Sequence, residues 1–124
     1  MFYAPTDEQI TWAIKKLKPY KATGPDGIPN AVFTHCRETL VPWLGKLFRA
    51  TFSLKYYPHA WKIFDTHVIR KPGKADYTVA KSYRPIALLK TMLKILSSTV
   101  AEILTYHAES LQLLPNTHFG CRPG

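Results

Sequence analysis

The stretch Val68–Leu89 reads VIRKPGKADYTVAKSYRPIALL and holds two short apolar runs separated by a polar connection. A turn signal, Pro72-Gly73, follows the first run, and the second run extends from Tyr83 to Leu89. Two apolar runs joined by a loop that contains glycine predict a β-hairpin with a long tip.

Basic side chains gather on or beside this predicted tip. They are Arg70, Lys71, Lys74, Lys81 and Arg84. Like charges on one hairpin repel one another, so an anionic partner such as a phosphate group would explain the cluster. A solvated lysine-rich loop is the alternative that charge alone leaves open.

The composition indicates one folded domain, or a piece of one, with an affinity for polyanions. The chain has 124 residues, of which 46% are hydrophobic and 13% aromatic, and this is enough apolar material to bury a core and to exclude disorder. Lys and Arg total 17 against 8 Asp and Glu, and the net charge of +9 favours polyanionic partners.

The cysteine content and the N-terminus bear on the compartment. Cys36 and Cys121 provide neither a disulfide framework nor a zinc site, which favours a reducing, intracellular location, either cytoplasmic or nuclear. The N-terminus lacks the features of a secretory signal, and no apolar run is long enough to span a bilayer. We therefore expect no membrane partner.

Helical periodicity precedes the hairpin. Thr6 and Gln9 form a capping box in front of a helix that we expect to end at Pro19. A second short helix is expected after Pro29, with Cys36 on its apolar core face. A third is expected over about 42–56, with its aromatic stripe in the core.

The segment Tyr20–Pro29, YKATGPDGIP, contains two glycines and two prolines and is predicted to be a structured loop. One interpretation is that it places Lys21 and backbone amides near an anionic strand. From the residues alone, a simple connector between helices is the more economical interpretation.

Helical periodicity returns after the hairpin, from Met92 to Leu104. Lys90 and Lys94 lie near the start of this predicted helix, where positive charge is unfavourable, so we expect them to serve a contact rather than helix stability. A shorter helix is expected over about 108–114, ending at Pro115.

Four segments resemble, in order, the N-terminal part of the reverse transcriptase of non-LTR (LINE-type) retrotransposons. They are Lys21–Ile28 (KATGPDGI), Trp61 with Val68–Lys74 (VIRKPGK), Ser82–Leu89 (SYRPIALL) with Lys94 following, and Leu113–Gly124 (LLPNTHFGCRPG). Each segment alone is a weak signal, but four in this order at this spacing are a strong one, and they cover nearly the whole chain from Lys15 onward.

The resemblance implies an α+β fold, namely the helix-rich fingers subdomain of a right-hand polymerase with one basic β-hairpin, incomplete at the C-terminus. Residues 1–124 would form a single partial reverse transcriptase domain, comprising the fingers and the entrance to the palm. The chain would be a fragment of an RNA-directed DNA polymerase, with an RNA template, a DNA primer and a dNTP as partners. The alternative is a non-catalytic basic nucleic-acid-binding module or an inactive relic.

The resemblance also implies roles for individual basic residues. The fingers hairpin would close over the incoming nucleotide, with Lys71, Lys74 and Arg84 as the candidate phosphate-binding residues. Guanidinium and ammonium groups both suit phosphate oxygens. Further nucleic-acid contacts are expected from Lys21, Arg70, Lys81, Lys94 and Arg122.

Catalysis is expected to need residues that this chain does not supply. Nucleotidyl transfer uses two metal ions held by clustered aspartates, and the resemblance implies that these lie in palm motifs beyond the segment matched by Gly124. None of the four aspartates of the chain, at positions 7, 26, 65 and 76, matches a metal-binding position. We therefore expect no catalytic residue here and no activity of this chain alone, with Mg²⁺ bound only in the complete polymerase.

Overall fold

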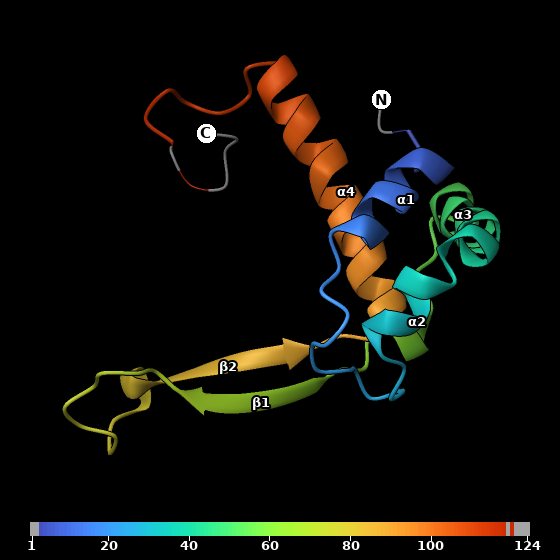
Figure 1. Ribbon diagram of the computed structural model, residues 1–124. Coiled ribbons are helices and arrows are strands. Elements are labelled where there is room, and N and C mark those ends of the chain that lie inside the picture. Colours follow the sequence, from blue (N-terminus) through green and yellow to red (C-terminus); the bar gives the residue numbers. More distant parts are fainter. Residues whose placement is uncertain (1–2, 119, 121–124) are drawn as a thin grey trace.

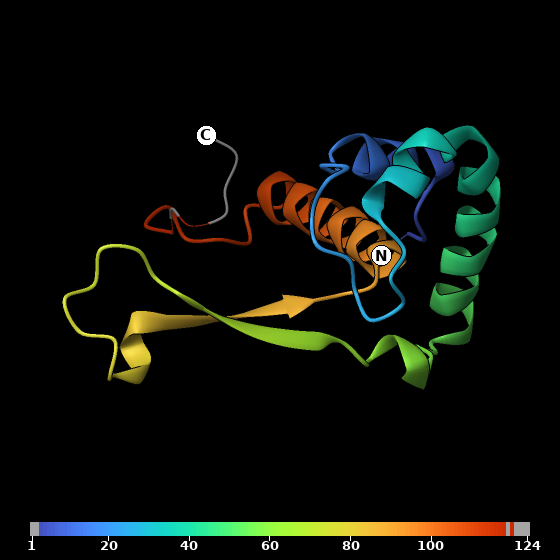
Figure 2. The ribbon, with the colours of Figure 1, turned by 60° about the horizontal axis from the view of Figure 1, so that its bottom comes forward.

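A two-stranded hairpin projects from a group of packed helices (Figures 1 and 2). The computed structural model describes residues 3–118 and 120. The elements are, in order, α1 (Asp7–Lys15), α2 (Asn30–His35), α3 (Arg37–Leu54), β1 (Asp65–Arg70), β2 (Tyr83–Leu88) and α4 (Thr91–Ser110), with 3₁₀ turns at His59–Trp61 and Ala80–Ser82. This mixture of helices with one antiparallel strand pair agrees with the expected α+β class.

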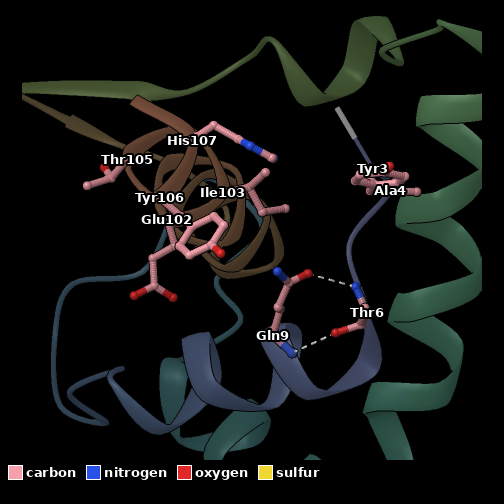
Figure 3. A pocket seen from close by; sticks show the side chains of 9 residues that line it. All are labelled: Tyr3, Ala4, Thr6, Gln9, Glu102, Ile103, Thr105, Tyr106 and His107. Carbon is pink, nitrogen blue, oxygen red and sulfur yellow. Dashed lines mark hydrogen bonds between the residues drawn. The ribbon is translucent and has the colours of Figure 1, made fainter. Parts of the chain in front are cut away.

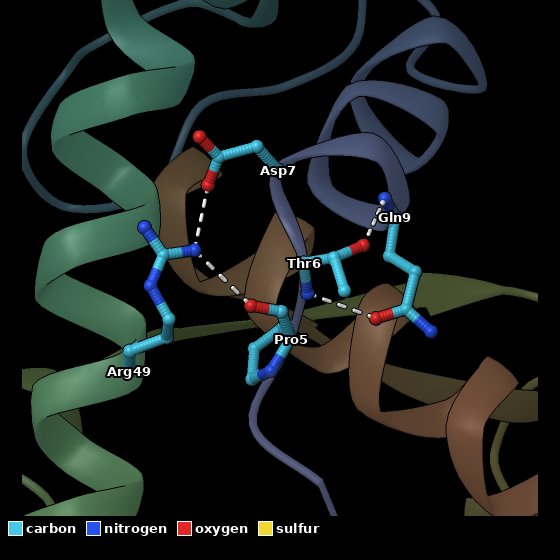
Figure 4. A network of polar contacts seen from close by, with 5 residues as sticks. All are labelled: Pro5, Thr6, Asp7, Gln9 and Arg49. Carbon is cyan, nitrogen blue, oxygen red and sulfur yellow. Dashed lines mark hydrogen bonds and ion pairs between the residues drawn. The ribbon is translucent and has the colours of Figure 1, made fainter.

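The predicted capping box begins α1 (Figure 4). The Gln9 backbone N–H donates to the Thr6 hydroxyl at 3.2 Å, and the Thr6 backbone N–H donates to Gln9 Oε1 at 3.0 Å. These bonds satisfy two backbone donors that the first turn of a helix leaves unpaired.

An ion pair joins the start of α1 to α3. Arg49 donates to the Asp7 carboxylate at 2.6 Å and to the Pro5 carbonyl at 3.3 Å (Figure 4). The absence of a side chain at Gly45 makes this possible, because a Cβ there would lie 2.2 Å from the Asp7 carboxylate. The pair is partly exposed, so we take it to set the orientation of α1 more than its stability.

The core lies between α1, α3 and α4, with α2 and Trp61 closing one end. Phe48 of α3 is fully buried, as are Ile10 and Ile14 of α1. The other buried apolar residues of this cluster are Ala13, Phe33, Val41, Leu44, Trp61, Leu93, Ile95 and Leu96. The helical spacing of the apolar residues therefore predicted most of the core.

The helix boundaries differ from the predicted ones. Helix α1 ends at Lys15 rather than at Pro19, because the chain turns away to place the Lys18 carbonyl against the Asn30 side-chain amide, at 2.8 Å. Helix α3 begins at Arg37 and contains Pro42, which removes one backbone hydrogen bond near the start of the helix.

The C-terminal ends of α3 and α4 also differ from the predicted boundaries. Lys55 and Gln112 adopt left-handed backbone conformations just past α3 and α4. The hydrogen bonds from Tyr56 to Thr51 (3.2 Å) and from Leu113 to Ala108 (2.9 Å) complete Schellman motifs. The separate helix expected over 108–114 was therefore wrong, because α4 continues to Ser110 and then stops.

Several side chains expected on apolar core faces are exposed instead, namely Val32, Cys36, Trp43, Leu47 and Leu104. Cys36 occupies the junction between α2 and α3, where the helical phase changes, so it does not share the buried face of Phe33. Trp43 is 67% exposed, whereas Leu44 and Phe48 of the same predicted stripe are buried. The Trp43 ring is contacted by the Lys46 ammonium at 4.6 Å.

Within residues 3–118 and 120, every helix is too short or too polar to cross a bilayer.

The capping box generates a stability prediction. Thr6→Ala should lower the free energy of unfolding by about 1 kcal/mol, because the first turn of α1 loses its side-chain acceptor. Urea denaturation followed by circular dichroism measures the change. Thr6→Ser retains the hydroxyl and should stay close to the original chain, and an equal loss in both variants would contradict the capping role.

Candidate nucleic-acid interface

The structure confirms the hairpin predicted from Val68–Leu89. Strands β1 and β2 pair antiparallel with a register that runs from Asp65 opposite Leu88 to Arg70 opposite Tyr83. One further backbone bond, from Lys71 N–H to the Ser82 carbonyl at 2.9 Å, extends the pairing toward the tip.

Two tyrosines organise the tip beyond the strands. The Tyr77 hydroxyl donates to the Lys71 carbonyl at 2.9 Å, and the Tyr83 hydroxyl donates to the Tyr77 carbonyl at 2.8 Å. Their rings meet edge to face with centroids 6.2 Å apart. The sequence did not reveal this role of the tyrosines, although one tyrosine inside a polar tip and another at its end were a usable signal.

Asp76 forms a second anchor in the tip. Its carboxylate accepts hydrogen bonds from the Thr78 hydroxyl at 2.6 Å and from the Thr78 backbone N–H at 2.7 Å. These bonds favour the charged form and lower the pKa of Asp76 below its ordinary value, with the hydroxyl bond as the larger cause. The Ser82 hydroxyl donates to the Asp76 carbonyl and ties this turn to the start of β2.

The two arginines of the hairpin lie on opposite faces. Directly opposed residues of an antiparallel pair share a face, so Arg84 lies on the face of Ile69, and Arg70 lies on the face of Tyr83. The Arg70 guanidinium is 5.2 Å from the Tyr77 ring centroid. The structure thus brings the predicted basic residues onto one hairpin but divides them between two surfaces.

The three lysines of the tip differ in their contacts. The Lys71 ammonium donates to the Lys81 carbonyl at 2.8 Å and is half-buried. Lys74 and Lys81 are exposed. Lys71 therefore helps to hold the tip together, whereas Lys74 presents its charge to solvent.

The strands themselves are open to solvent on both faces. All six residues of β1 are exposed, including the apolar Val68 and Ile69. An isolated two-stranded hairpin is only marginally stable in water. The bonds in the tip are therefore important for its shape, and its surface is available to a partner.

The loop that carries Lys21 lies beside the base of the hairpin (Figures 1 and 2). A Cβ at Gly24 would lie 2.5 Å from the Lys90 nitrogen, so only glycine fits this approach. The Lys94 ammonium donates to the Ala22 carbonyl at 2.8 Å, and the Lys90 ammonium donates to the Ala60 carbonyl at 3.0 Å. Both lysines therefore serve a contact, as expected, and Lys21 is exposed.

A buried polar network completes the attachment of the loop. The Thr91 hydroxyl lies 3.0 Å from the Ile28 carbonyl and 2.8 Å from Asn30 Oδ1, while the Asn30 amide donates to the Lys18 carbonyl. Thr91 is fully buried and Asn30 nearly so. The sequence reasoning missed both residues, because nothing local distinguishes them from ordinary polar side chains.

A cavity of about 860 Å³ lies beside the C-terminal half of α4 (Figure 3). Its lining comes from the N-terminal segment, from α1 and from the second half of α4, and includes Tyr3, Gln9, Glu102, Tyr106 and His107. The described lining residues include none of the basic residues of the hairpin.

The described residues do not fit a catalytic metal. No group of three or more His, Cys, Asp or Glu side chains in residues 3–118 and 120 is placed to hold a metal ion. Asp7 pairs with Arg49, Asp26 accepts from the Ile28 backbone N–H at 3.3 Å, and Asp76 binds Thr78. Arg122, which was predicted to contact nucleic acid, lies outside the described residues.

The close approach at Gly24 generates a second stability prediction. Gly24→Ala should lower the free energy of unfolding by about 1–3 kcal/mol, because the new methyl group overlaps the backbone of Leu89 and Lys90. Urea denaturation measures the loss. Gly27→Asn is the matched control, because its Cβ meets no described atom within 4 Å and asparagine tolerates the left-handed conformation at φ 68°. Equal losses would contradict the packing role of Gly24.

The Asp76 turn generates a prediction of pH dependence. Only the carboxylate accepts both bonds, so their stabilisation is complete above the ordinary pKa of 3.8 and is lost as the pH falls through the lower folded pKa. Thr78→Val should raise the pKa of Asp76 toward 3.8, whereas Thr78→Ser should keep it low. Carboxyl ¹³C NMR titration distinguishes the two variants, and identical titrations would show that the side-chain bond is unimportant.

The amino-acid sequence of the chain is similar to those of known RNA-directed DNA polymerases. The chain is 32% identical over 117 residues to a probable RNA-directed DNA polymerase from transposon BS of Drosophila melanogaster. It is 34% identical over 116 residues to the corresponding protein of transposon X-element, and 30% identical over 119 residues to the RNA-directed DNA polymerase from mobile element jockey, both from the same species.

These alignments cover 94–96% of the chain, and the chain spans 13% of the length of each of these relatives. No family model matches the chain. The matches confirm the resemblance drawn from the four sequence segments. Over nearly its whole length, the chain is similar to one segment of the RNA-directed DNA polymerases of non-LTR retrotransposons.

Proposed function

We propose that residues 1–124 form the fingers, and the entrance to the palm, of a retrotransposon reverse transcriptase. The observation that carries this proposal is the similarity of 94% of the chain to RNA-directed DNA polymerases. The projecting basic hairpin supports it, because a template or an incoming nucleotide presents phosphates that such a surface attracts.

Lys74 and Arg84 are the proposed primary phosphate contacts on the hairpin. Both side chains are exposed, and a guanidinium binds phosphate oxygens in a bidentate manner while an ammonium acts as a point charge. Lys71 is proposed to assist these two residues, while its ammonium donates a hydrogen bond to the Lys81 carbonyl. In phosphoryl transfer, such cations stabilise the charge that develops on the phosphate.

The template and primer are proposed to contact the remaining basic groups. Arg70 and Lys81 lie on the hairpin, and Lys21 lies on the loop beside its base. Lys94 already binds the Ala22 carbonyl, so its contribution would come through the position of that loop. Because the described residues do not fit a catalytic Mg²⁺, the proposed role of this segment is to bind and position substrates for metal-bearing acids elsewhere in the polymerase.

Removing two charges from the hairpin tests this role. Lys74→Ala with Arg84→Ala should weaken binding to a labelled RNA–DNA template–primer by roughly tenfold at low salt, because the variant loses two phosphate contacts. The slope of log K against log salt should also become shallower by about 0.9 for each phosphate that the variant no longer binds. Fluorescence anisotropy over a salt series measures both quantities, and a dNTP titration of the preformed complex tests nucleotide binding.

Arg37→Ala with Lys46→Ala is the matched control, because it also removes one arginine and one lysine, and both residues lie on α3, outside the hairpin. It should reduce binding far less than the hairpin variant. Equal effects of the two variants would mean that net charge alone attracts nucleic acid. An unchanged affinity in the hairpin variant would contradict the proposed function.

A further inference from the structure

The segment Lys15–Lys21, KKLKPYK, places four lysines and one tyrosine within seven residues and contains no acidic residue. All four lysines are exposed, and Tyr20 is 91% exposed. A tyrosine so fully in solvent contributes nothing to the core, so its ring is available to a partner.

The backbone of this segment is held in place on both sides of Tyr20. The Asn30 amide donates to the Lys18 carbonyl at 2.8 Å, and the Lys94 ammonium donates to the Ala22 carbonyl at 2.8 Å. Asn30 is nearly fully buried, so the first anchor belongs to the core. The Tyr20 ring therefore extends from a fixed backbone, which lowers the entropy that a partner must remove on binding.

Three of the four lysines of the segment differ in their contacts and in their position relative to Tyr20. Lys16 pairs with Glu102 at 2.6 Å and lies 3.0 Å from the Trp12 ring centroid, so its charge is used within the molecule. Lys18 and Lys21 flank Tyr20, and their Cα atoms are at most about 11 Å apart because they are three positions apart in the chain. Two exposed lysines thus flank the exposed tyrosine along the chain.

We propose that Lys15–Lys21 is a second nucleic-acid contact, in which one base of a single strand stacks on Tyr20 while Lys18 and Lys21 bind the adjacent phosphates. Alternation of aromatic rings with cations is the pattern of sequence-tolerant single-strand binding. Protein–protein interfaces, by contrast, are depleted in lysine, and this argues against a protein as the partner of this segment.

The position of the segment extends the surface of the hairpin. Its C-terminal end leads into the loop that contacts Leu89 and Lys90 through Gly24, directly beside the exit of β2 (Figure 1). A nucleic-acid strand that contacts the base of the hairpin would therefore continue onto Lys21 and Tyr20. The inference rests on the proposed nucleic-acid role of the chain and adds a stacking residue to it.

Anisotropy titrations of the 124-residue chain with labelled single-stranded oligouridylate and oligothymidylate test the proposal. Tyr20→Ala should weaken single-strand binding by about tenfold, whereas Tyr20→Phe, which retains the ring, should bind like the original chain. Lys18→Ala with Lys21→Ala should make the salt slope shallower by about 0.7 for each lysine removed. Weaker binding of Tyr20→Ala to either oligonucleotide supports the stacking role. The oligonucleotide whose affinity falls identifies the partner as RNA, DNA or both.

Tyr106→Ala is the matched control, because Tyr106 is an exposed tyrosine on another element, α4, outside the lysine segment. Circular dichroism confirms that each variant is folded. Unchanged affinity in Tyr20→Ala, or an equal decrease in Tyr106→Ala, would overturn the inference.

The hairpin variant separates the two proposals. If Lys74→Ala with Arg84→Ala weakens binding while Tyr20→Ala does not, the inference fails and the proposed function stands. If Tyr20→Ala weakens binding while the hairpin variant does not, the stacking role is supported and the proposed role of the hairpin is contradicted. A chain that binds neither oligonucleotide and does not bind the RNA–DNA template–primer at low salt overturns both.

Discussion

The fully buried hydroxyl of Thr91 is the contact on which the arrangement of this molecule depends. It lies at the first turn of α4, within hydrogen-bonding distance of the Ile28 carbonyl and of the Asn30 side chain. Asn30 in turn holds the Lys18 carbonyl. Three separate segments therefore meet at one polar cluster, and β2 enters α4 directly beside it. Because burying these groups without partners would be costly, the cluster allows one orientation of the loop relative to the hairpin.

The molecule combines a packed helical body with an exposed hairpin, and the two parts are stabilised differently. The body depends on apolar burial around Phe48, whereas the hairpin depends on its backbone ladder and on the hydroxyl bonds of Tyr77 and Tyr83. Local stability in proteins follows the amount of buried contact, so the hairpin should open more readily than the body. A partner that contacts the hairpin would also order it.

The division of Arg70 and Arg84 between the two faces of the hairpin matters for the proposed function. Because the two guanidinium groups start from opposite faces of the strand pair, we propose that the two faces serve different phosphate groups. In the proposed polymerase, one face would meet the nucleotide and the other would meet the template. An exposed apolar residue of β1 accompanies each arginine, Ile69 on the face of Arg84 and Val68 on the face of Arg70, where bases and sugars would offer complementary apolar surface.

The sequence alone determined the features that are encoded within a few neighbouring residues. The capping box at Thr6, the apolar stripes of the helices, the hairpin around Pro72-Gly73 and the ordered family motifs were all predicted. Only the tertiary structure decided the contacts between distant segments, such as Thr91 with Asn30, 61 positions apart, and Lys94 with Ala22, 72 apart. It also decided that Cys36 is exposed. Periodicity reports which side chains share a face of one element, but burial and pairing depend on which other element packs there.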